Sequence, residues 1–143
     1  MKESDPLANF GAATTLIGDG SPRFESNLKF TVSNVSGTVM SAKLRLYAIN
    51  GTSDGPALYT TGSSWTETGI TGITWATRPA TTSGVIADKG KVTSATWVEY
   101  DVKPIVTGNG TYSFLLRMTN SNDIRMYSRE ASSLRPELTL TVG

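Results

Sequence analysis

Seven polar side chains of this 143-residue chain carry groups that suit a charged ligand. They are the guanidinium, ammonium, amide and phenol groups of Arg23, Asn27, Lys29, Arg45, Arg125, Tyr127 and Arg129. Each occupies an outward position in a segment where polar and apolar residues alternate, as they do along a β-strand. A guanidinium forms two parallel hydrogen bonds with a carboxylate, and phenols and amides bond hydroxyls. These residues therefore predict a surface that binds a polyuronate chain.

A solvated strand face accounts for the same residues, since Lys and Arg are mostly exposed in folded proteins. Outward acids on these strands are few, namely Glu25, Glu130 and Glu137. If strands 23–32 and 123–129 share a sheet, their cations and amides line one face together. A contiguous basic groove would indicate ligand binding. A flat face with charges of both signs would indicate a spacer, and a deep pocket with paired acids would indicate catalysis.

The absence of His and Cys removes most catalytic chemistry from consideration. Without them there is no Ser-His or Cys-His nucleophile, no His general base, no thiolate metal site and no disulfide. The glutamates lie on separate segments, so spacing leaves a glycosidase-type acid pair open, although solvated strand faces and turns account for them as well; they are Glu25, Glu67, Glu99, Glu130 and Glu137. Tyr127, between Arg125 and Arg129, has only a superficial likeness to a Tyr-based lyase site. We expect no enzyme activity.

The three Trp residues have a structural and a ligand-binding interpretation. An exposed indole stacks on sugar rings, but a large ring also plugs the end of a β-sandwich. Trp65 and Trp75 lie in an irregular stretch, 62–84, and we expect them to be structural. Strict alternation places Trp97 on the face opposite Val98.

Charge and turn composition narrow the class of partner. The chain has 13 Lys and Arg against 12 Asp and Glu, which argues against nucleic-acid binding. No apolar run approaches the ~20 residues that span a bilayer. We expect a monomer, and the sequence identifies no definite cofactor. Acids in the turns leave room for a structural calcium ion held by scattered loop oxygens, and these acids are Asp19, Asp54, Asp88 and Asp123.

The elements that position these groups are short strands. Residues 38–49 and 111–118 alternate between apolar and polar, and the closing stretch 124–142 reads as two strands joined by a polar loop. Turn signals separate about eight or nine such segments, and no long helix is indicated. The sequence predicts one domain, 1–143, folded as an all-β, jelly-roll-like antiparallel β-sandwich.

An ordered set of short motifs covers nearly the whole chain. They are Asn9–Gly11, Glu25–Phe30, Ser41–Tyr47, Trp65–Glu67, Thr74–Trp75 with Pro79, Trp97–Val102, Ser128–Glu130 and Arg135–Leu138. In this order they resemble DNRLRE-type domains, one branch of which is classed as alginate-binding carbohydrate-binding modules. That resemblance implies a jelly-roll-like β-sandwich appended to secreted bacterial and archaeal proteins, among them polysaccharide lyases.

Taken together, residues and resemblance predict a secreted, non-catalytic module that binds an acidic polysaccharide, alginate first among them, through a basic sheet face. The expected partners are that polymer and a covalently linked catalytic domain in a larger protein. The alternative is a structural or adhesive spacer of a cell-surface protein without a sugar ligand.

Overall fold

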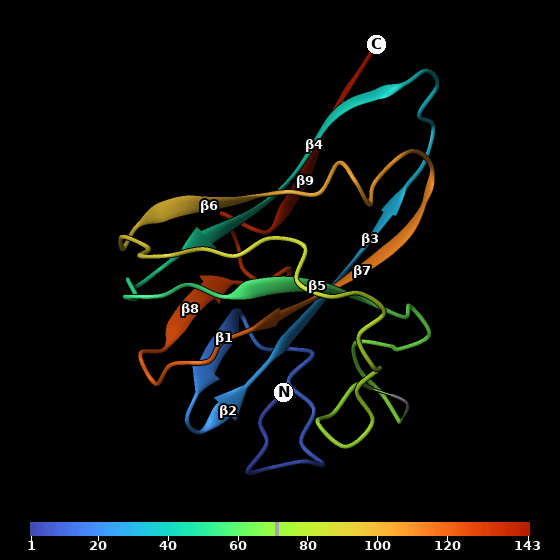
Figure 1. Cartoon of the computed structure of the whole chain (residues 1–143). Coiled ribbons are helices and arrows are strands. Elements are labelled where there is room, and N and C mark those ends of the chain that lie inside the picture. Colours follow the sequence, from blue (N-terminus) through green and yellow to red (C-terminus); the bar gives the residue numbers. More distant parts are fainter. Residues whose placement is uncertain (71) are drawn as a thin grey trace.

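The computed structural model describes residues 1–70 and 72–143, which contain nine strands and no helix (Figure 1). The strands are β1 (Thr15–Gly20), β2 (Arg23–Phe24), β3 (Ser26–Val32), β4 (Val39–Ala48), β5 (Ala57–Thr61), β6 (Thr96–Asp101), β7 (Gly110–Arg117), β8 (Ile124–Tyr127) and β9 (Glu137–Val142). They form two antiparallel sheets, which confirms the predicted all-β sandwich. No helix in the described part of the chain could cross a membrane.

Strand β4 lies in the middle of the larger sheet. Its inward residues Ala42, Leu44, Leu46 and Ala48 are completely buried, as the alternation in 38–49 predicts. Strand β6 pairs with one edge of β4, while β9 and then β8 pair with the other. Strand β8 pairs with β1, and β1 with β2, so six strands make up this sheet.

The smaller sheet contains β3, β7 and β5 in that order. Its inward residues join those of β4 in one apolar core, to which it contributes Leu28, Leu58, Phe114 and Leu116. Burying such side chains contributes about 1.5–3 kcal/mol each, so the space between the sheets holds most of the stabilising free energy.

The prediction that Arg23 to Val32 forms a single strand is wrong. The segment breaks at Glu25, so that β2 belongs to the larger sheet and β3 to the smaller one. Alternation cannot reveal this crossing, because both halves keep a period of two residues. Strands β3 and β8 consequently lie in different sheets, and the condition for one continuous basic face is not met.

The outer face of the smaller sheet is covered by residues 62–70 and 72–84, hereafter the covering segment. The hydroxyl groups of Ser63 and of Ser113 on β7 are hydrogen-bonded, with their oxygen atoms 2.8 Å apart. Leu115, which alternation places opposite the core, is only 2% exposed. This sheet is therefore buried on both faces where the covering segment lies on it.

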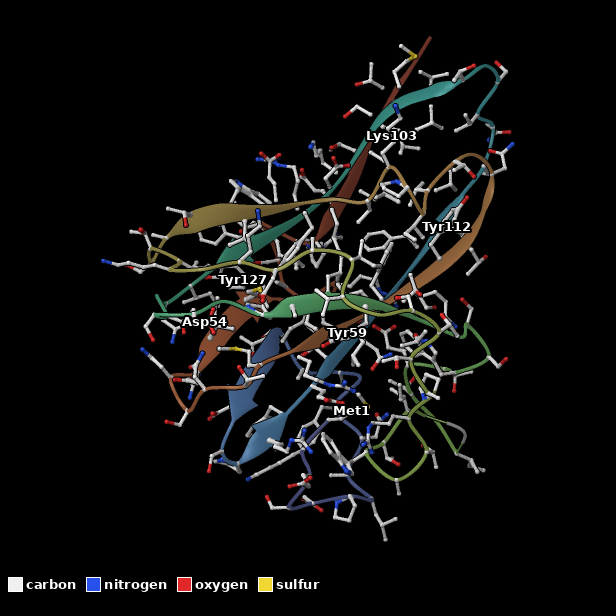
Figure 2. All side chains as sticks on the ribbon, in the orientation of Figure 1. Met1, Asp54, Tyr59, Lys103, Tyr112 and Tyr127 are labelled. Atoms are coloured by element: carbon white, nitrogen blue, oxygen red, sulfur yellow. The ribbon has the colours of Figure 1, made fainter. Side chains whose placement is uncertain are left out.

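A buried carboxylate fastens the covering segment to β7. Glu25 was expected on a solvated face, yet it is 2% exposed. Its carboxylate lies 2.5 Å from Nε of Arg117 and 3.3 Å from Nε of Arg78. The Arg78 guanidinium lies 3.8 Å from the Trp75 ring centroid, and the Arg117 guanidinium lies 4.9 Å from that of Tyr59 (labelled in Figure 2). The two acid–arginine pairs thus sit against aromatic rings that shield them from water.

Candidate functional site

The seven predicted ligand-binding residues fall into three places. Asn27, Lys29 and Arg129 line one open cleft. Residues Arg45, Arg125 and Tyr127 belong to β4 and β8 of the larger sheet. Arg23 is on β2, where its Nη1 lies 3.4 Å from Glu3, and both side chains are half exposed. The structure therefore does not gather the set on a single face.

The cleft lies between edge strand β3 and the connection from β8 to β9. Its volume is about 640 Å³. It is lined by side chains of β1, β3, the covering segment and that connection, namely Leu16, residues 27–31, residues 65–67, Ser128, Arg129 and Pro136. A hollow of this size falls in the range of small-ligand sites, about 300–1,000 Å³.

Trp65 positions the ammonium group of Lys29 in this cleft. The Lys29 Nζ lies 4.4 Å from the centroid of the Trp65 ring and donates a hydrogen bond to the Trp65 backbone carbonyl. A cation over an indole face is attracted by about 0.5–1 kcal/mol at an exposed site. The charge of Lys29 is therefore held beside an aromatic wall.

Two polar atoms in the same wall lack a partner. Nε1 of Trp65 and Oδ1 of Asn27 are buried and have no hydrogen-bond partner among the described residues. A smaller cavity of about 130 Å³ adjoins the cleft, and both side chains line both hollows. An unpartnered buried donor or acceptor costs about 1–3 kcal/mol unless a water or ligand atom supplies the missing hydrogen bond.

Arg129 is bound by acids at the mouth of the cleft. Its Nη2 lies 2.7 Å from Oε2 of Glu67, and its Nε lies 3.4 Å from Oε1 of Glu130. Burial raises the pKa of the Glu67 carboxyl above its usual 4.5; Arg129 and Lys29 oppose the rise, whereas Glu130 adds to it. The guanidinium side chain itself is 76% exposed and accessible to a ligand.

The N-terminal segment fixes the wall that carries Trp65 and Glu67. The Asn9 amide donates to the backbone carbonyls of Glu67 at 2.9 Å and Ile73 at 2.8 Å. A Cβ on Gly11 would lie 1.9 Å from the Glu67 carbonyl oxygen, so only glycine permits this approach. The close packing of these two segments sets the position of the cleft wall.

The outer face of the larger sheet carries paired charges. Arg45 lies 3.3 Å from Glu99 on β6 and 2.9 Å from Glu137 on β9. Lys43 likewise lies 3.7 Å from Asp101, and Arg125 lies 3.4 Å from Asp123. The outer face of the larger sheet therefore carries positive and negative charges side by side.

The aromatic rings on that face turn toward one another. Tyr47 meets Trp97 edge-on, with centroids 5.4 Å apart, and stacks on Tyr127 at 6.0 Å. Arg45 covers the Trp97 ring at 4.4 Å. Cross-strand pairs of this kind stabilise a sheet.

Sequence reasoning missed Trp65 and Glu67 as cleft residues, since it treated the first as structural and the second as a solvated turn residue. The signal that indicated them was the motif Trp65–Glu67. The structure brings it together with Asn9–Gly11 and Ser128–Glu130 around the cleft. Trp75, by contrast, is buried, as expected.

No three acidic side chains in residues 1–70 and 72–143 gather closely enough to hold a metal ion. The expected structural calcium would also use backbone oxygens, and it stays a prediction.

No curated protein sequence matches the chain. A family model does match, over residues 1–142, and its description is carbohydrate-binding module family 96. The match spans every strand of both sheets and every wall of the cleft. The chain therefore belongs to carbohydrate-binding module family 96.

Proposed function

We propose that this carbohydrate-binding module recognises an acidic polysaccharide, such as alginate, in the cleft between β3 and the β8–β9 connection. The observation that carries the proposal is the placement of Lys29 and Arg129 on one cleft that has an aromatic wall. Each cation would pair with a uronate carboxylate, Arg129 through its fork of donors and Lys29 as a point charge. Neutral sugars offer no partner for either charge.

Unpartnered polar atoms support a sugar as the ligand. A hydroxyl both donates and accepts hydrogen bonds, so one that entered the smaller cavity would complement the Trp65 N–H donor and the Asn27 carbonyl acceptor, which are buried in the free protein. Exposed ion pairs contribute only about 0.2–1 kcal/mol each. Micromolar affinity corresponds to about 8 kcal/mol, so several charges and hydroxyl contacts must act together.

The acids of the cleft suit a non-catalytic role. Glu67 and Glu130 both contact the Arg129 guanidinium and lie within hydrogen-bonding reach of each other. Carboxyl groups that cleave a glycosidic bond flank that bond, about 5–9.5 Å apart. Glu67 and Glu130 are instead close enough to hydrogen-bond each other, which leaves no room for a glycosidic bond between them.

We further propose that the module is secreted and that it directs a linked catalytic domain, such as a polysaccharide lyase, to its polymer. The second candidate function is a spacer without a ligand. The mixed-sign outer face of the larger sheet favours that alternative, since its cations are already paired.

The test is isothermal titration or affinity electrophoresis with alginate, polygalacturonate and a neutral xylan in low salt. We expect binding to the two polyuronates only, and weaker binding at high salt because screening acts over about 8–10 Å near physiological ionic strength. Lys29→Ala and Arg129→Ala should each lower affinity several-fold. Lys43→Ala, on the outer face, is the matched control and should bind normally.

Two results would contradict the proposal. Absence of binding to either polyuronate would favour the spacer. Loss of binding in Arg125→Ala together with full binding in Lys29→Ala would move the site to the larger sheet.

A further inference from the structure

The cation best placed to hold a ligand carboxylate already holds one from its own chain. The Arg129–Glu67 distance of 2.7 Å is that of a charge-assisted hydrogen bond. We propose that Glu67 is an internal competitor, which the ligand's carboxylate must displace from Arg129, so that Glu67 sets both the specificity and the pH response of the cleft. This inference rests on the proposed function.

The charges that face Glu67 come from two elements. Strand β3 supplies Lys29, and the β8–β9 connection supplies Arg129 and Glu130. From the N-terminal segment, Asn9 contacts only the backbone carbonyl of Glu67. Two cations and two acids therefore balance at the mouth of the cleft, although a polyanion requires a net positive charge there.

Competition gives the site its selectivity. A polymer with closely spaced carboxylates can present another carboxylate whenever one dissociates, and it can engage Lys29 at the same time. A polymer with sparse carboxylates has to displace Glu67 with a single group. The site should therefore discriminate against weakly charged chains more strongly than Lys29 and Arg129 alone would.

Protonation of Glu67 should release Arg129. Because burial raises the Glu67 pKa, this acid becomes neutral at a higher pH than an exposed carboxylate of the polymer does. As the pH falls through the raised pKa of Glu67, the competitor loses its charge while the polymer, whose carboxylates are exposed, keeps more of its own. Polyuronate binding should strengthen as this happens.

The central experiment measures polygalacturonate affinity of Glu67→Gln in low salt at pH 7. We expect binding about two- to fivefold tighter than wild type, the ratio that an exposed ion pair allows. Glu99→Gln is the matched control, since Glu99 also pairs with an arginine, Arg45, but on the outer face of the other sheet. Its affinity should equal that of wild type.

A double-mutant cycle separates competition from a general charge effect. If Glu67 acts through Arg129, the gain from Glu67→Gln disappears in an Arg129→Ala background. A gain that persists there overturns the inference. A wild-type affinity that rises as the pH is lowered below 7, with a flat profile for Glu67→Gln, supports it.

The outcomes also distinguish this inference from the proposed function. If wild type binds polygalacturonate but Glu67→Gln binds equally or more weakly at every pH, the inference alone fails. If wild type binds no polyuronate between pH 5 and about 7, the proposed function fails as well. Circular dichroism of each variant confirms that the affinities refer to folded protein.

Discussion

Lys29 shows how a single residue prepares this site. Its ammonium group is held by both the ring and the backbone carbonyl of Trp65. A free lysine loses considerable rotamer freedom when it pairs with a ligand, and that loss weakens binding. Because Trp65 already restricts Lys29, less freedom would remain to be lost if a carboxylate bound there, as we propose.

The residue scale also gives a test of burial. Leu44→Ala and Leu115→Ala should each lower the free energy of unfolding by about 2–5 kcal/mol, since both side chains are almost completely buried. Lys43→Ala, next to Leu44 but outward, should change it by less than about 1 kcal/mol. Urea denaturation measures all three. A loss below about 1 kcal/mol for Leu115→Ala would mean that the covering segment does not protect β7.

At the scale of the elements, side-chain contacts hold the covering segment in place, and one of them involves a buried carboxylate. Residues 62–70 and 72–84 contain no strand, so few backbone hydrogen bonds hold them against the smaller sheet. The contact of Glu25 with Arg78 joins the segment to β7, because Glu25 also holds Arg117. Trp65, which supports Lys29, lies on the same segment.

Removal of that carboxylate should loosen the covering segment. Glu25→Ala leaves two partly buried guanidinium groups without their acid, and a change of this kind costs about 3–5 kcal/mol. Urea denaturation and the rate of proteolysis within 62–84 measure the effect. Glu3→Ala is the control, because Glu3 and its partner Arg23 are half exposed and should contribute at most about 1 kcal/mol. Equal losses in both variants would contradict the role given to Glu25.

At the scale of the whole molecule, three distant parts of the sequence make the cleft: β1 with β3, the covering segment, and the β8–β9 connection. The N-terminal segment packs on the covering segment, and the β8–β9 connection closes the side opposite β3. Figure 1 shows the N-terminal segment and the covering segment at the same end of the sandwich. We therefore expect a disturbance at this end to change the cleft more than it changes the core between the sheets.

Gly11→Ala tests that separation. The added Cβ would meet the Glu67 backbone, so the two segments must move apart and the cleft wall must shift. We expect several-fold weaker polyuronate binding, together with a urea midpoint close to that of wild type. Gly84→Ala is the control, since nothing lies within 4 Å of its added Cβ. Unchanged binding in Gly11→Ala would show that the N-terminal segment does not position the cleft.

The sequence by itself determined the fold class and the inward faces of several strands. Alternation is a local property, so the buried positions of β4 could be read directly from Ala42, Leu44, Leu46 and Ala48. The ordered motifs likewise pointed to a carbohydrate-binding module before any contact was known. Neither inference required knowledge of which strands are neighbours.

Only the tertiary structure decided which outward residues share a site. The two-residue alternation of a strand shows which of its side chains lie on the same face. It does not show which strands pair or what covers the outer face of a sheet. For that reason Arg45 and Arg125 were grouped with Lys29, although they lie in different sheets. Glu25 was likewise expected at the surface, because the arginine that buries it, Arg78, comes from a segment without periodicity. Long-range pairing placed Lys29 and Arg129 on one cleft, since it brings β3 beside the β8–β9 connection.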